Sequence, residues 1–332
     1  MRAGFVRDLL LALGAVGLAA VLYAVVDDPG IHDLVIKTCI FGIFALSLNL
    51  LIGTLGLVAF GHAAFFAAGA YAFGLFMQSP LVRESADPNW AIPAGFAVAV
   101  AAATLLAAGI GAICIRAGTI YFSFLTLALQ MILYSAILAF VSITGGDQGL
   151  TGGFAKPAFL GVDLTRPFHY YLFCVGLLAA VAVIMRQIVE SPFGYALRMI
   201  RDNPVRAEFL GIAVQLHRWL AFVMAGGLAG IAGVMMSLFV VGAFPEFAYW
   251  AMSAEPLFMI LLGGSEVFLG PVAGALILQL LNAVVTANTR YYGLVLGVVV
   301  LVFVLGLRRG LLDFAWALAA RRREAGDGSA QT

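Results

Sequence analysis

Residues that could carry out chemistry are few in this chain and stand far apart. The three cysteines, Cys39, Cys114 and Cys174, each lie inside an apolar run, and their spacing fits neither a disulfide framework nor a metal site. The only lysines are Lys37 and Lys156, and the sequence holds no G-x-x-x-x-G-K-[ST] phosphate-binding loop. We therefore expect no catalytic residue, no metal and no cofactor in this chain.

Segment 191–211 is a long charged segment that separates two long apolar runs. Ser191 followed by Pro192 is a helix-start signal, because the hydroxyl can cap free N–H groups and proline is tolerated in the first turn. Asn203 followed by Pro204 repeats this signal. The residue before a proline is steered out of the α region. The segment therefore predicts one helix ending near Asp202 and a second from Pro204 to Gly211.

The first of these two helices has two distinct faces. Phe193, Leu197 and Ile200 share one face, whereas Arg198 and Arg201 lie on another. One face can rest on a membrane domain while the other contacts a soluble partner. The simpler alternative is a solvated loop whose arginines only hold it on the cytosolic side.

Composition places the chain among polytopic membrane proteins. Hydrophobic residues make up 63% of the 332 residues, charged residues 11%, and the mean hydropathy is +1.06. We expect an all-α membrane protein with about ten membrane-inserted helices, some of them short or broken. The expected segments are 9–26, 34–52, a small-residue helix after 61, 90–115, 118–141, 170–189, 219–241, a short piece at 253–262, one ending at 286, and 293–307. Residues 1–310 would form one transmembrane domain and 311–332 a cytosolic tail.

The distribution of positive charge predicts the orientation. With both termini inside, only Lys37, Arg83, Lys156, Arg166 and Arg290 of the 18 lysine and arginine residues fall outside. This asymmetry predicts cytosolic termini and a cytosolic segment 191–211, with the long polar break 142–169 on the outer side.

Glycines interrupt two apolar stretches, 53–61 and 263–270, and each interruption is followed by a helix rich in small residues. Non-helical backbone at membrane depth is tolerated only where protein or a water-filled cavity satisfies it. The alternative is that the small residues only allow close helix packing. His62, directly after the first interruption, would either contact a transported ligand or be satisfied by nearby carbonyls.

Five stretches of this sequence resemble one family. They are SPFGYALRMIRDNPVRAEFLGI at 191–212, GTLGLVAFGHAAFFAAGAY at 53–71, GTIYFSFLTLA at 118–128, TGGDQGLTG at 144–152, and the run that begins SAEP at 253 and continues past GGSEVFLGP. Together they are similar to the permeases of branched-chain amino-acid ABC importers, of the LivM-type subunit. The chain departs from the family's pattern at Val58 and Ala59, where a serine is usual, and at Glu266, which replaces a glycine.

The resemblance implies roles for particular residues. ATPase coupling would involve Phe193, Gly194, Ala196, Arg198, Ile200, Arg201, Asn203, Ala207 and Gly211. The translocation pathway would involve Asn49, Gly61, His62, Phe65, Tyr71, Tyr121, Thr126 and Glu255. An external loop or gate would contain Gly145, Gly146, Asp147 and Gly149, although such glycines also suit an ordinary ordered loop. Glu255 has a second interpretation, as a cap in the first turn of a short helix starting near Ser253.

The resemblance also implies the assembly. The chain would be a non-catalytic permease subunit in a bacterial inner membrane, moving branched-chain amino acids or similar small polar solutes inward. Its partners would be a second, LivH-like permease, cytosolic ATPase subunits and an external substrate-binding protein, with no nucleic acid involved. The alternative is a secondary transporter or channel, against which stands the shortage of paired intramembrane charges suited to ion coupling.

Overall fold

The computed structural model describes residues 2–84, 90–151, 163–288, 293–295, 297, 298 and 301. Within these ranges, seven helices are long and apolar enough to cross a membrane, and two shorter apolar helices accompany them. The expected all-α polytopic membrane fold is confirmed. Most of the last predicted span, 293–307, and the whole tail 311–332 lie outside the described residues.

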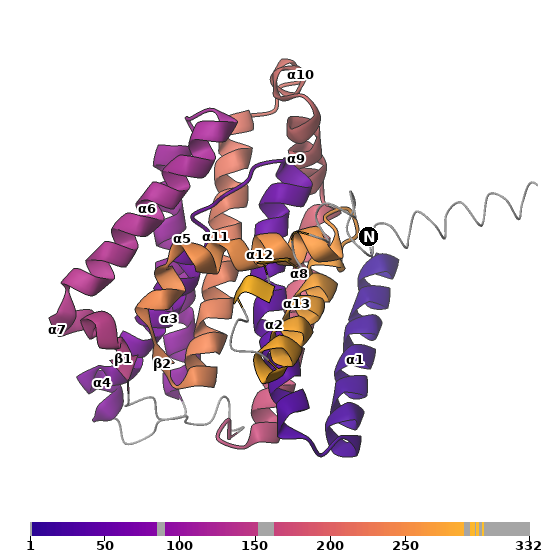
Figure 1. The fold of residues 1–332 in the computed structure, drawn as a ribbon. Helices are drawn as coiled ribbons and strands as arrows, with labels where there is room; N and C mark the ends of the chain where they lie inside the picture. The colour runs from indigo at the N-terminus through magenta and orange to yellow at the C-terminus, as the bar shows by residue number, and fades with distance from the viewer. Residues whose placement is uncertain are drawn as a thin grey trace, which may run out of the picture.

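The long helices stand side by side in a bundle, and α12 lies across them in the view of Figure 1. In chain order the elements are α1 (Arg2–Val25), α2 (Pro29–Asn49), the π-helix η1 (Leu50–Leu55), α3 (Ala63–Gln78), α4 (Pro80–Arg83), α5 (Ala91–Cys114), α6 (Thr119–Ala139), α7 (Val141–Thr144), the 3₁₀ turn η3 (Gly146–Gln148), β1 (Leu150–Thr151), α8 (Pro167–Val189), α9 (Pro192–Asp202), α10 (Pro204–Phe209), α11 (Val214–Val240), β2 (Gly242–Ala243), the 3₁₀ turn η4 (Pro245–Ala248), α12 (Trp250–Gly263) and α13 (Gly270–Asn288).

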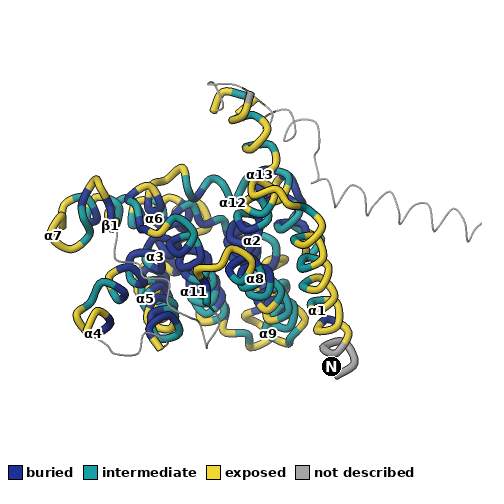
Figure 2. Tube along the Cα trace, turned by 90° about the horizontal axis from the view of Figure 1, so that it is seen from below, coloured by how far each residue is buried: buried dark blue, intermediate teal, exposed yellow. Residues whose placement is uncertain are grey.

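The core of the bundle is formed by α2, α3, α5 and α11, and Figure 2 shows buried residues concentrated along α2, α3 and α11. Small residues let these helices approach closely. A Cβ added at Gly233 of α11 would lie 2.0 Å from the Phe66 carbonyl oxygen, and one at Gly69 of α3 would lie 2.3 Å from that of Gly230. These glycines therefore allow α3 and α11 to pack at close range.

The two ends of the bundle carry different features. Helices α9 and α10 project from one end, whereas α4, α7 and the strands lie toward the other (Figure 1). The strands were not predicted: Leu150 pairs with Ala243 and Thr151 with Gly242, which ties the loop after α6 to the turn after α11. Asp163, before α8, accepts hydrogen bonds from the Thr165 hydroxyl and N–H, and these bonds lower the pKa of its carboxyl.

Helices α1, α2, α8, α11 and α12 all begin earlier than the sequence predicted. Helix α2 begins at Pro29 because the Asp28 carboxylate accepts a hydrogen bond from the Gly30 N–H at 2.8 Å and so caps it. Helix α11 begins at Val214 rather than Trp219. Helix α12 begins at Trp250 after an extended Tyr249, and its proline, Pro256, lies inside the helix instead of marking its start.

Candidate site at the broken helix and the coupling helices

The break predicted in the first glycine-rich stretch is present. Helix α2 runs directly into the π-helical turn η1, which ends at Gly56 in the left-handed conformation with φ 76°. The chain then follows non-helical backbone until α3 starts at Ala63. Such backbone inside a membrane protein needs hydrogen-bond partners from its neighbours.

Hydroxyl groups from two other helices supply these partners. Ser123 of α6 donates to the Val58 carbonyl oxygen at 2.6 Å. Thr126, one turn further along α6, accepts from the Gly61 N–H at 3.3 Å, and Ser253 of α12 accepts from the Ala63 N–H at 2.8 Å. The break is therefore a built feature, held by α6 and α12.

A buried glutamine extends this network. Ser253 donates its own proton to Gln130 Oε1 at 2.7 Å, and Gln130 Nε2 donates to the Ala248 carbonyl at 3.0 Å. Both side chains are buried. The network joins α3, α6, η4 and α12, so Gln130 and Ser253 belong to the site although the sequence analysis assigned them no role. The sequence feature that could have identified them is a polar side chain within an apolar run.

His62 is fully buried beside the break. Its Nε2 lies 2.8 Å from the Ser47 hydroxyl oxygen, and Ser47 gives its single proton to the Phe44 carbonyl at 2.7 Å. Nε2 must then be the protonated nitrogen that donates to Ser47, which leaves Nδ1 as an acceptor. Nδ1 has no hydrogen-bond partner in the described part of the chain. His62 is thus hydrogen-bonded to a side-chain hydroxyl, whereas one of the two interpretations from the sequence expected backbone carbonyls.

The predicted pathway residues fall into two groups. Gly61, His62, Phe65 and Thr126 come together at the break, where a Cβ at Gly61 would lie 2.0 Å from the Thr126 carbonyl oxygen. Within the described ranges, no hydrogen bond or ring contact joins the other predicted residues to this cluster. Tyr121 is 75% exposed on α6, Tyr71 lies further along α3 with a buried hydroxyl, and Asn49 lies at the end of α2.

Glu255 occupies a different position from the one expected. It is the sixth residue of α12, in the second turn, so the prediction that it lies in the first turn was wrong. Its Oε2 atom is buried and makes no hydrogen bond to any described residue. The capping interpretation therefore loses its geometric basis, because the dipole effect falls off beyond the first turn.

The two predicted helices of segment 191–211 are confirmed as α9 and α10. The Ser191 hydroxyl accepts from the Gly194 N–H at 3.3 Å, and the Asn203 side chain accepts from the Arg206 N–H at 2.9 Å, so both expected caps are present. Helix α10 ends at Phe209, two residues before Gly211, which has φ 84°. Leu197 and Ile200 are buried against the bundle.

Arg201 connects α9 to the broken helix. Its Nη1 donates a hydrogen bond to the carbonyl oxygen of Gly53 in η1, and a Cβ at Gly56 would lie 2.9 Å from the Arg201 side chain. Gly53 itself has no room for a side chain, because a Cβ there would lie 2.6 Å from Asn49 Oδ1 and 2.9 Å from the Ser265 carbonyl oxygen. Helix α9, the break and the α12–α13 turn therefore meet at Gly53.

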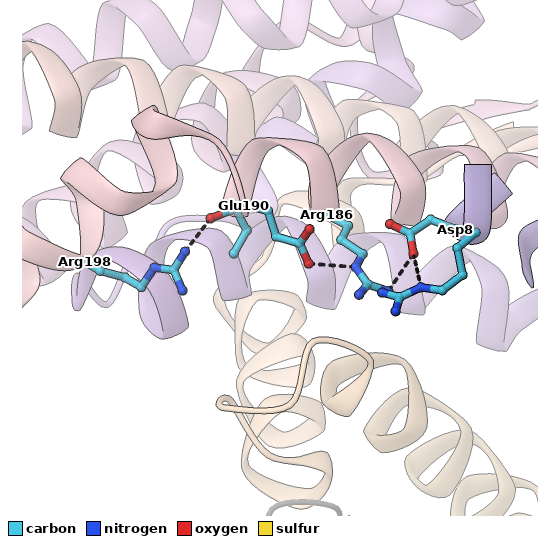
Figure 3. Close-up of polar contacts among 6 residues, drawn as sticks. Asp8, Arg186, Glu190 and Arg198 are labelled. Atoms are coloured by element: carbon cyan, nitrogen blue, oxygen red, sulfur yellow. Dashed lines mark hydrogen bonds and ion pairs between the residues drawn. The ribbon is translucent and has the colours of Figure 1, made fainter. Parts of the chain in front are cut away.

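A second set of polar contacts fixes the base of α9 (Figure 3). Arg186 of α8 lies 3.0 Å from Asp8 of α1 and donates from Nε to Glu190 at 2.9 Å. Arg198 of α9 donates from Nη2 to the Val189 carbonyl at 2.7 Å and lies over the Tyr195 ring at 4.5 Å. Helices α1, α8 and α9 are thereby linked at one end of the bundle.

Several predicted coupling residues face the chain itself. Gly194, Ile200 and Ala207 are buried, and a Cβ at Gly194 would lie 2.2 Å from the Val189 carbonyl oxygen. The close approach at Gly194 is therefore to α8. The exposed apolar side chains of α9, α10 and the following residue were not among the predicted ones; they are Tyr195, Met199, Val205, Phe209 and Leu210.

The glycine loop after α7 is an ordered turn. Gly145, Gly146 and Gly149 all have positive φ, and a Cβ at Gly149 would lie 2.4 Å from the Ala243 carbonyl oxygen. Asp147 is exposed at this turn. The geometry accounts for these glycines as turn and strand-contact residues.

The fold and the site together describe a multi-pass helical membrane protein with an interrupted inner helix and two short helices that project from one end. Residues 30–305 match the family described as branched-chain amino acid transport system, permease component, so the chain belongs to this family of ABC transport permeases. The family resemblance noted in the sequence is thus confirmed.

Individual relatives agree with this assignment. The chain is 25% identical over 329 residues to the high-affinity branched-chain amino acid transport system permease protein LivM of Escherichia coli strain K12, with 91% of this chain and 74% of the relative covered. LivM of Salmonella typhimurium is 26% identical with the same coverage. A probable permease LivH of Methanocaldococcus jannaschii is 29% identical over 119 residues, 33% of this chain and 36% of that protein. No solved structure matches the chain.

Proposed function

We propose that this chain is the LivM-like permease subunit of an ATP-driven importer for branched-chain amino acids. In the proposed assembly it pairs with a LivH-like permease inside the membrane. Outside the membrane, α9 and α10 contact cytosolic ATPase subunits, and the opposite end of the bundle contacts a substrate-binding protein. ATP hydrolysis takes place on the ATPases, because this sequence holds no phosphate-binding loop.

The surface of α9 and α10 carries the proposal. Phe209 is 88% exposed, and Tyr195 and Val205 are also exposed on helices that project from the bundle. Leu210, directly after α10, is exposed as well. Apolar side chains grouped outside the membrane-spanning part indicate a protein contact. The Arg201 hydrogen bond to Gly53 then gives a route by which movement of α9 reaches the broken helix.

The orientation belongs to the same proposal. Segment 191–211 is cytosolic, both termini are cytosolic, and the protein lies in the bacterial inner membrane, as the excess of arginine on that side favours. Residues 1–310 form the transmembrane domain. Asp147 and the glycine loop around it lie outside, where they offer a contact to the binding protein.

Co-purification tests this function. Phe209→Ser should lose most of the ATPase retained by the wild-type permease, because a central apolar contact of an interface contributes about 2 kcal/mol or more. Leu81→Ser is the matched control, since Leu81 is also exposed but lies on α4 at the other end. Equal ATPase retention by both variants would contradict the contact, and uptake without any ATPase would instead identify a secondary transporter or channel.

A further inference from the structure

Polar side chains form two facing rows on α2 and α13, at the end of the bundle away from α9 and α10. Asp33 and Lys37 lie one turn apart on α2, and Gln279, Asn282 and Thr286 follow helical spacing on α13. Both helices are apolar enough to cross a membrane. Polar groups on such helices are costly unless they line a cavity or bind something.

The two rows line one cavity. It has a volume of about 390 Å³ and is bounded by all five of these side chains together with small and apolar residues of the same two helices. This volume lies in the range of about 300–1,000 Å³ typical of small-molecule sites. The helices themselves are closely packed against each other, so the cavity has defined walls.

Within the described ranges, the charges in the cavity have no ion-pair partners. The ion pairs there involve only Arg7, Asp8, Arg186 and Glu190, so Asp33 and Lys37 are paired neither with each other nor with another described residue. The Lys37 ammonium lies 5.7 Å from the centre of the Phe239 ring. Gln279 is only 6% exposed and its amide makes no hydrogen bond to a described residue.

We propose that this cavity binds the zwitterionic head of an α-amino acid before it enters the pathway. The Asp33 carboxylate takes the ligand's ammonium, the Lys37 ammonium takes its carboxylate, and the Gln279 and Asn282 amides and the Thr286 hydroxyl satisfy the remaining polar atoms. One cation and one anion on the same helix face match a ligand that carries one of each. This inference rests on the proposed import of amino acids.

Protection from alkylation tests the site directly. The permease complex is placed in nanodiscs with Asn282→Cys, and its reaction with N-ethylmaleimide is followed with and without L-leucine. The native cysteines are buried. L-leucine should slow the reaction about tenfold, since charged hydrogen bonds hold it there. Leucinamide, which lacks the carboxylate, and 4-methylpentanoate, which lacks the ammonium, should protect weakly. Ser142→Cys, exposed on α7, should show no protection.

Charge variants identify the groups that bind. Asp33→Asn or Lys37→Met should abolish protection by L-leucine and lower L-leucine uptake about tenfold. The charge controls Asp27→Asn and Arg83→Met, both exposed, should behave like the parent protein. In Lys37→Met, L-leucine should protect no better than leucinamide, because the carboxylate no longer has its partner.

The possible failures are distinct. If the wild type imports L-leucine while Asn282→Cys is unprotected and the charge variants transport normally, the cavity is not the site and only this inference falls. If the wild type imports no L-leucine and is not protected by it, both the proposed function and this site fall. If alkylation follows the phosphatidylethanolamine content of the nanodisc and not L-leucine, the cavity holds a lipid headgroup and the inference is overturned.

Discussion

Arg201 of α9 donates a hydrogen bond to the backbone carbonyl of Gly53 in the π-helical turn η1, across 148 residues of sequence. Gly53 also contacts Asn49 and the turn between α12 and α13 so closely that no side chain fits there. The acceptor is therefore a backbone carbonyl in η1, directly before the non-helical stretch that leads to α3. A displacement of α9 by a partner would therefore act first on the break that Ser123, Thr126 and Ser253 hold in place.

The first prediction concerns the network that holds the break. Ser253→Ala leaves the Ala63 N–H and Gln130 Oε1 without their partner, so the free energy of unfolding should fall by about 1–3 kcal/mol. Thermal unfolding in detergent measures this. Ser142→Ala, at an exposed position on α7, should have no effect. Equal melting temperatures for the two variants would show that the network contributes nothing to stability.

The second prediction concerns Gly194. Even Gly194→Ala should destabilise the permease itself by about 1–3 kcal/mol, because the new Cβ would lie 2.2 Å from the Val189 carbonyl oxygen. The resemblance implies a coupling role for Gly194, and in the structure its close approach is to α8. Gly176→Ala, on α8 in open space, is the control and should be tolerated. A Gly194→Ala permease as stable as this control would refute the packing.

Much of the fold could be predicted from the sequence because its signals are local. Apolar runs marked the spans, and Ser191-Pro192 and Asn203-Pro204 marked α9 and α10 to within two residues. The glycines before His62 marked the break. A helix cap, a proline or a left-handed turn affects only the backbone a few residues away, so the local sequence is enough to predict its effect.

The contacts between distant segments could not be predicted. Nothing near Arg201 indicates that it points inward to Gly53, or that Tyr121 is exposed while its neighbour Phe122 is buried. The same limit applies to Glu255. Its helix starts three residues earlier than Ser253, after an extended Tyr249, and the preceding turn η4 packs against the distant helices α3 and α6.

A third prediction follows for Glu255. If this carboxylate serves the pathway, Glu255→Gln should lower uptake about tenfold or more, since hydrogen bonds to a charged group contribute about 1.5–3 kcal/mol. Assembly and basal ATP hydrolysis should persist. Glu246→Gln, on η4, should transport normally. Normal uptake by the Glu255→Gln complex would remove Glu255 from the pathway.

A fourth prediction concerns orientation. In a background without Cys39, Cys114 and Cys174, Gln148→Cys should react with an impermeant maleimide from outside and Arg206→Cys only from inside. Both positions are exposed, and they lie at opposite ends of the bundle. Arg206 is the better labelling position than Asn203, because the Asn203 side chain caps α10 and its replacement would disturb the helix. Labelling of both from the same side would rule out the proposed topology.

The most direct test of the account measures ATP hydrolysis and L-leucine uptake together in proteoliposomes containing the complete importer. Arg201→Met keeps the length of the side chain but removes its hydrogen bond to Gly53, so hydrolysis should continue while uptake per ATP falls several-fold. Arg206→Met, on the exposed surface of α10, is the control and should keep the wild-type ratio of uptake to hydrolysis. Its rate of ATP hydrolysis reports whether the ATPase is still bound. An unchanged ratio of uptake to hydrolysis in Arg201→Met would contradict the coupling route through Gly53.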